Sequence, residues 1–264
     1  MTTLEVERPV VLRQRRAGAD GRLLLLHGLA NSATVWQGFT EHDTGFATWA
    51  ADLPWRGEGV AGWSQRGDLA GWVAEAIASV PGDGPLTVVA HSFSANLLLA
   101  LLDREPALVG DLASVVLVSP FYRSAPERFE WTDISRYLND FHTIMEDGIR
   151  AQGGQRLSPA VRRELALRVR DLVGPYGWTR FFQTYLDTPW LRLDRLDLPV
   201  LVLSGENDFA ALPGEARALA AALPDARVRV LPDCGHFLMA ERPERFAAEI
   251  TRFVHPLSVG ETTR

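Results

Sequence analysis

The sequence predicts an α/β fold, in which a doubly wound, mostly parallel sheet carries an inserted helical cap. Two observations favour the sheet. Short apolar runs alternate with helix-like segments over most of the 264 residues, and most of these runs are apolar throughout rather than at every second position. Strands that are buried on both faces of a parallel sheet have this pattern. A third observation predicts the cap, because residues 121–191 contain no run of this kind.

Six apolar runs have the length of buried strands. They are followed by polar or turn-forming residues, as at His27-Gly28 and His91-Ser92. Because these segments end at one edge of a parallel sheet, we expect the residues that follow them to gather there. The expected strands are residues 23–26, 46–53, 86–90, 114–118, 200–203 and 227–231.

Helix-like segments separate these runs. Pro213 and Pro243 each suit the first turn of a helix, where a missing N–H costs nothing. The repeated order of strand and helix predicts a doubly wound sheet. The expected helices are residues 68–80, 95–104, 213–223 and 243–254.

Residues 121–191 are rich in charged and aromatic side chains. Ser158 followed by Pro159 reads as a helix start, which predicts a helix over residues 160–172. We therefore expect a core domain of residues 1–120 and 192–264, with residues 121–191 inserted as a helical cap.

Composition narrows the function classes. The formal net charge is -6 and the pI is near 5.6, so the surface repels phosphate backbones and anionic lipid, and neither nucleic acid nor a membrane is expected as a partner. All 27 basic residues are arginine, which rules out lysine Schiff-base chemistry. Cys234 is the single cysteine, so no intrachain disulfide can form.

Neither a signal peptide nor a membrane span is expected. The first nine residues contain no apolar run, and no apolar stretch approaches the length of a bilayer-spanning helix. These features predict a cytoplasmic protein. The histidines are scattered and no glycine-rich phosphate loop is visible, so no metal and no cofactor are expected.

Ser92 stands where the apolar run 86–90 meets the next helix-like segment. A serine at a sharp strand-to-helix turn exposes its hydroxyl above the sheet. The tight turn needs small residues two positions before and after the serine, and Ala90 and Ser94 occupy those places. The turn also aims the backbone N–H of Phe93 at whatever is bound to Ser92. A fixed donor at this place stabilises the oxyanion that develops during the reaction. An ordinary serine in a turn is the alternative interpretation.

A serine hydroxyl needs a base to become a nucleophile. His236 follows the last apolar run, and its neutral imidazole can accept the proton of Ser92. The histidine in turn needs a carboxylate to orient it. Asp208 follows the run 200–203 and is the expected acid, with Glu206 as the nearby competitor.

These three segments resemble motifs of the α/β-hydrolase superfamily. Ser92 lies in a variant of the G-x-S-x-G elbow with both glycines replaced, Asp208 in a G-x-x-D acid loop, and His236 in a histidine loop followed by Glu-x-Pro. The chain order Ser, Asp, His is also that of the family. The resemblance covers residues 23–120 and 192–253, and it implies a cap-bearing serine hydrolase similar to esterases and lactonases.

The resemblance also implies a second oxyanion donor. His27-Gly28-Leu29 is similar to the family's His-Gly loop, in which the residue after glycine contributes its backbone N–H. Leu29 is therefore expected to join Phe93 in an oxyanion hole. We expect His27 to brace this loop, and the side chain of His91 to pack or hydrogen-bond away from the substrate.

The expected partner is a hydrophobic small molecule, because the inserted segment is rich in aromatic residues. The expected reaction is cleavage of an ester or lactone, with a thioester as a further option, through an acyl-enzyme on Ser92. Two alternatives stay open: another enzyme on the same scaffold (a lyase, cyclase, acyltransferase or C–C bond hydrolase) and a binding protein without turnover. The residues expected to contact substrate are Trp55, Phe121, Tyr122, Trp131, Phe141 and Phe182.

Overall fold

A single seven-stranded sheet forms the centre of the protein. The computed structural model describes residues 10–56, 63 and 67–260. The strand order is β1-β3-β2-β4-β5-β6-β7, and every neighbouring pair is parallel except β1 with β3. The strands are β1 (Val11–Arg16), β2 (Arg22–Leu26), β3 (Ala47–Asp52), β4 (Leu86–His91), β5 (Ser114–Val118), β6 (Val200–Gly205) and β7 (Ala226–Leu231).

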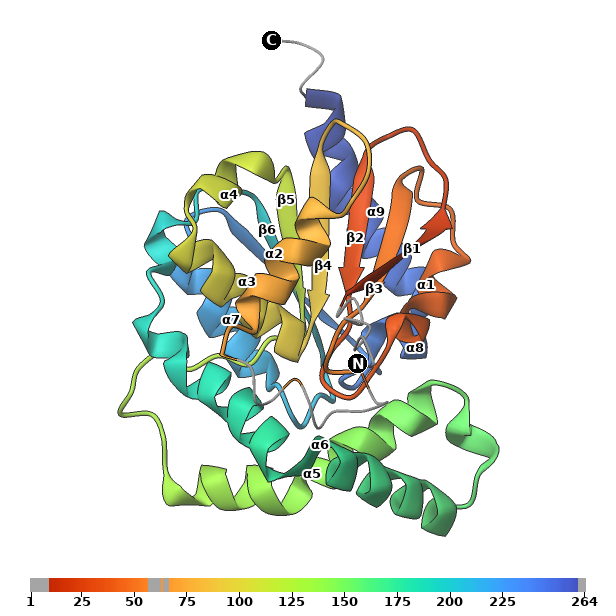
Figure 1. Ribbon diagram of the computed structural model, residues 1–264, viewed down its shortest axis with the longest axis vertical. Helices are drawn as coiled ribbons and strands as arrows, with labels where there is room; N and C mark the ends of the chain where they lie inside the picture. Colours follow the sequence, from red (N-terminus) through yellow and green to blue (C-terminus); the bar gives the residue numbers. More distant parts are fainter. Residues whose placement is uncertain (1–9, 57–62, 64–66, 261–264) are drawn as a thin grey trace, which may run out of the picture.

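Helices cover both faces of the sheet, and two long helices cross one end of it (Figure 1). The α-helices are α1 (Gln37–Thr40), α2 (Ala70–Ala78), α3 (Phe93–Arg104), α4 (Ala107–Asp111), α5 (Trp131–Ala151), α6 (Pro159–Asp187), α7 (Pro213–Ala222), α8 (Leu238–Glu241) and α9 (Pro243–Gly260). This arrangement confirms the predicted doubly wound fold.

Strand β2 shows why the predicted runs are apolar throughout. Leu23 and Leu25 pack into the buried cluster that contains Phe246 of α9. Leu24 and Leu26 belong instead to the cluster on the opposite face. Successive side chains of a strand point to opposite faces, so a strand covered by helices on both sides needs an apolar residue at every position.

The sequence analysis did not predict β1, which forms the edge of the sheet. Its sequence VLRQRR contains three arginines, and most of its side chains are exposed or half-buried. An antiparallel edge strand faces water, and charged side chains protect such an edge from further pairing. The strand therefore lacks an apolar run of the kind that identified the buried central strands.

Between β5 and β6 the chain leaves the sheet and forms α5 and α6, which we call the cap helices. They lie across the end of the sheet at which β4 ends (Figure 1). Helix α6 is broken at Gly174, whose φ of 65° and ψ of 175° are not helical, and Pro175 follows directly. The helix predicted over residues 160–172 is thus confirmed but continues past this break. The proposed division into domains at residues 120 and 192 remains a prediction.

None of the helices in the described part of the chain is both long and apolar enough to cross a membrane.

Candidate active site

Ser92 occupies a strained turn between β4 and α3. Its φ is 56° and its ψ is -120°, in a region that residues other than glycine rarely adopt. The backbone N–H of Ser92 donates to the carbonyl of Val118 at 2.8 Å, which anchors the turn to the end of β5. Ala90 and Ser94 are both fully buried, as the requirement for small residues predicts.

Ser94 contributes more than its small size. Its hydroxyl donates a hydrogen bond to the backbone carbonyl of His27, at the end of β2. The imidazole of His27 accepts the N–H of Leu53 through Nε2 at 2.9 Å and bonds the carbonyl of Gly28 through Nδ1 at 2.8 Å. Burial lowers the pKa of His27 to about 4, so the ring stays neutral. His27 therefore braces the loop after β2, as we expected.

The structure brings Ser92, His236 and Asp208 together. Nε2 of His236 lies 3.0 Å from Oγ of Ser92, and Nδ1 lies 2.9 Å from Oδ2 and 3.1 Å from Oδ1 of Asp208. An ionised carboxylate can only accept, so Nδ1 carries the ring proton and Nε2 presents its lone pair to the serine hydroxyl. This is the tautomer that a general base requires.

Backbone N–H groups in the turn after Asp208 bind its carboxylate. Its Oδ1 accepts from Ala210 at 3.0 Å and from Ala211 at 2.9 Å. The competing carboxylate of Glu206 is exposed and accepts the N–H of Asp233 at 3.4 Å. Asp208 is thus the carboxylate that contacts the histidine.

His91 lies beside the candidate base, with the two ring centroids 4.9 Å apart. Its Nε2 is 3.0 Å from the carbonyl of His236, so Nε2 carries the proton because a carbonyl can only accept. Burial, followed by the nearby His236, lowers the pKa of His91 well below its usual value. His91 thus packs and hydrogen-bonds as expected, but it also lines the cavity at Ser92, which corrects the expectation that it does so away from the substrate.

Glu241 holds the loop that carries His236, a role that sequence reasoning missed. Its two carboxylate oxygens accept the N–H of Gly235 at 3.0 Å and that of Phe237 at 3.1 Å. The carboxylate therefore bonds the backbone on both sides of the histidine. The Glu-x-Pro sequence after the histidine loop was the signal that could have identified this contact.

The loop after β2 approaches the elbow closely. A Cβ on Gly28 would lie 3.0 Å from Cβ of Ser92 and 2.9 Å from Nδ1 of His91, so only glycine fits there without displacement. Leu29 follows at the rim of the cavity, and Phe93 is the first residue of α3. The N–H of Phe93 thus belongs to the positive end of a helix, which favours negative charge.

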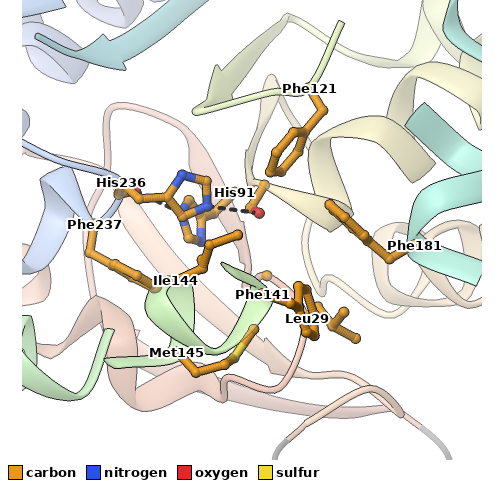
Figure 2. Close-up of a pocket in the computed structure, with 11 residues that line it drawn as sticks. Leu29, His91, Phe121, Phe141, Ile144, Met145, Phe181, His236 and Phe237 are labelled. Atoms are coloured by element: carbon orange, nitrogen blue, oxygen red, sulfur yellow. Dashed lines mark hydrogen bonds between the residues drawn. The ribbon is translucent and has the colours of Figure 1, made fainter. Parts of the chain in front are cut away.

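A small cavity lies at Ser92, and its wall combines apolar side chains with the imidazoles of His91 and His236 (Figure 2). Its volume is about 20 Å³, which is room for about one water molecule. Of the residues expected to contact substrate, Phe121 and Phe141 line it. The sequence analysis missed four of its apolar wall residues, Ile144, Met145, Phe181 and Phe237.

The other four expected substrate contacts lie elsewhere. Trp55 is fully buried in the core and donates through Nε1 to the carbonyl of His27 at 3.3 Å. Trp131 begins α5 with its side chain 83% exposed. Tyr122 and Phe182 are buried outside the cavity wall. A buried core and a helix end both use aromatic residues, so residue type alone did not distinguish these positions from the wall.

A hydrogen-bonded contact joins the cap helices to the core near Asp208. Glu215 of α7 accepts the hydroxyl of Tyr185 at 3.1 Å and the N–H of Tyr122 at 3.2 Å. Burial raises the pKa of Glu215 to about 7. Tyr137 of α5 donates to the carbonyl of Ala210 at 3.1 Å.

Cys234 is fully buried, and burial raises the pKa of its thiol to about 11. Both facts indicate a small core residue. Within the described residues, no group of three or more histidine, cysteine, aspartate or glutamate side chains is arranged to hold a metal ion.

The fold and this site place the chain among known proteins. The model of the alpha/beta hydrolase family matches residues 23–249. The chain therefore belongs to the alpha/beta hydrolase family and is a hydrolase.

The chain is also similar to proteins with named activities, at lower than 30% identity. A pimeloyl-[acyl-carrier protein] methyl ester esterase of Aromatoleum aromaticum is 28% identical over 246 residues, which cover 86% of this chain and 96% of that protein. The lipase LipV of Mycobacterium tuberculosis is 26% identical, over 93% of this chain and 98% of its own. Among solved structures, a thermophilic esterase from Thermogutta terrifontis has a TM-score of 0.63 at 22% identity, with 94% of each chain covered. The two relatives are thus an esterase and a lipase by name, and the solved structure shows the shared fold.

Proposed function

We propose that this hydrolase cleaves esters or lactones of hydrophobic small molecules, with thioesters as a further option, through an acyl-enzyme on Ser92. One observation carries the proposal. Ser92, His236 and Asp208 form a continuous hydrogen-bonded chain that ends at a cavity with apolar side chains in its wall. The names of the relatives, a methyl ester esterase and a lipase, support the same class of reaction.

The first step is proton transfer from Ser92 to Nε2 of His236 as the serine Oγ attacks the ester carbonyl carbon. The contact of 3.0 Å between the two atoms lies within the reach that general-base catalysis requires. Asp208 stabilises the resulting imidazolium through Nδ1–H and keeps the ring in place. His91 remains neutral because it is buried, so it adds no positive charge beside the imidazolium.

The tetrahedral oxyanion is stabilised by the backbone N–H groups of Leu29 and Phe93. Removal of one such donor typically raises the barrier by about 2.7–4 kcal/mol. The intermediate then collapses, and His236 returns the proton to the departing alcohol. Water, deprotonated by the same histidine, attacks the acyl-enzyme and releases the acid.

The test combines labelling with turnover. A fluorophosphonate probe should modify Ser92, and a panel of ester, lactone and thioester substrates should be hydrolysed by the wild type. Ser92→Ala should abolish both, while Ser114→Ala, which removes a buried hydroxyl that bonds Thr87, should retain both. Turnover that survives in well-folded Ser92→Ala would exclude Ser92 as the nucleophile.

The same panel separates the remaining alternatives. A lyase, cyclase or acyltransferase would label at Ser92 but release no acid from an activated ester with water as the acceptor. A β-diketone added to the panel would be cleaved by a C–C bond hydrolase instead. A binding protein without turnover would neither label nor hydrolyse. The cytoplasmic location and the absence of nucleic-acid and membrane partners remain predictions from the sequence.

A further inference from the structure

The cavity at Ser92 is too small for any ester in the structure as it stands. Its volume of about 20 Å³ accommodates about one water molecule. Even an acetyl group must therefore displace a side chain of the wall. Some side chains of the wall can move and others cannot. This difference decides which acyl groups fit.

Met145 and Phe141 both reach the cavity from α5 (Figure 2), but they differ in mobility. Methionine is unbranched and flexible, and it readily adapts to a change of shape. The ring of Phe141 is 97% buried and packs against Phe181 with centroids 5.8 Å apart. Phe181 in turn packs edge-on against Phe121 at 4.9 Å. A small acyl group can displace Met145, whereas Phe141 is held by a cluster of rings.

A much larger space lies on the far side of this wall. The outer groove, as we call it, runs between α5 and residues 209–212 and has a volume of about 560 Å³. Phe141 and Ile144 line both this groove and the cavity at Ser92. The two spaces are therefore separated at this point by two neighbouring side chains of one helix.

A second groove touches the same ring from another direction. It lies beside the break in α6 at Gly174, has a volume of about 450 Å³, and is lined by Phe141 and Leu138 but not by Ile144. Ile144 therefore distinguishes the outer groove from this second groove, and Leu138 lines only the second.

We propose that Phe141, supported by Ile144, determines specificity by closing the acyl pocket, so that the enzyme selects esters of short acyl groups. This inference rests on the proposed ester hydrolysis. A longer acyl chain would have to pass through the position of the Phe141 ring to reach the outer groove. Truncation of the ring joins the two spaces and admits longer chains.

The experiment measures kcat/KM for p-nitrophenyl esters from acetyl to decanoyl, with active enzyme titrated by a fluorophosphonate. We expect wild type to favour acetyl and propionyl over octanoyl by roughly tenfold or more, and Phe141→Ala to raise the octanoyl-to-acetyl ratio roughly tenfold. Ile144→Ala should shift the ratio in the same direction by a smaller factor. Leu138→Ala, whose side chain is 57% exposed on the second groove, should leave the ratio unchanged.

The ratio is independent of the fraction of folded enzyme, so loss of stability alone cannot produce the shift. Phe141→Leu, which keeps more of the buried volume, provides a second test if the alanine variant fails to fold. An unchanged ratio in active Phe141→Leu and Ile144→Ala would overturn the inference, as would a wild type that prefers octanoyl. Absence of turnover and labelling at every chain length would instead refute the proposed function.

Discussion

The elbow and the cap helices face each other across one cavity, but their residues are held in different ways. At the elbow, polar contacts fix each group: Ser92 through the carbonyl of Val118, His236 through Asp208, and its loop through Glu241. In the cap, Phe141 is held by packing against other rings. Directional hydrogen bonds fix the positions of reacting atoms, whereas apolar packing sets shape and volume. This difference agrees with the two proposals, in which the elbow side performs the chemistry and the cap selects the substrate.

The largest expected effect on activity comes from a substitution on the elbow side of the cavity. Asp208→Asn should lower kcat by about 10⁴-fold, since an amide at this place no longer selects the required histidine tautomer. Steady-state kinetics with an acetyl ester provides the measurement. Glu206→Gln is the matched control and should keep near wild-type activity, because Glu206 is exposed and bonds Asp233 instead of the histidine. If Glu206→Gln is the inactive variant, the acid is misassigned.

Glu241→Ala should have the next largest effect. Loss of a charged acceptor that bonds two N–H groups costs about 1.5–3 kcal/mol of stability, and displacement of His236 should lower kcat roughly tenfold. KM should change less, because no substrate contact is lost. Glu244→Ala, at an exposed position in the first turn of α9, is the control. A variant with normal kcat but lower stability would reduce Glu241 to a purely structural residue.

The contact between the cap and the core predicts a pH effect on stability. Burial raises the pKa of Glu215 to about 7 from 4.5, so the folded state retains a proton that the unfolded state loses. This contribution to stability is fully present below about pH 4.5 and disappears as the pH rises through 7.

Glu215→Gln removes this titration. Relative to wild type, its free energy of unfolding should therefore rise between pH 5 and pH 8, by at most about 3 kcal/mol. Denaturant unfolding at the two pH values measures the difference, with the exposed Glu164→Gln as the control. Parallel pH profiles for Glu215→Gln and wild type would contradict the prediction.

The smallest expected effect concerns the outside of the cap. Trp131→Ser should change kcat/KM by less than about twofold, because surface substitutions away from a site have small effects and this side chain is 83% exposed. Kinetics on the same series of esters tests it. A large loss with long-chain esters alone would show that Trp131 contacts substrate and would extend the binding surface beyond the cavity.

The same contrast explains how far the sequence could predict the molecule. Ser92 and Asp208 follow strands that are buried at every position, and His236 follows β7, in which arginine and valine alternate. The sheet brings the residues after its parallel strands to one edge. Local sequence was therefore enough to predict their convergence.

The cap and the edge of the sheet were harder to predict. In the cap, the packing of α5 and α6 decides which aromatic residues face the cavity. Residue type carries no information about this packing. Phe141 and Trp131 both belong to α5, yet Phe141 is buried and Trp131 is exposed. Strand β1 was missed because an exposed, arginine-rich edge has no apolar run.

Ser94 stands where related elbows have glycine, and the exchange has a consequence for how the site is assembled. Its hydroxyl bonds the carbonyl of His27, so the turn after β4 and the loop after β2 are tied to each other directly. The two proposed oxyanion donors, Leu29 in the loop after β2 and Phe93 at the start of α3, are therefore held in position by the same hydrogen bond. A glycine introduced at position 94 would remove this hydrogen bond. The two loops would then no longer be tied to each other, and the spacing between the backbone N–H groups of Leu29 and Phe93 would be less well fixed.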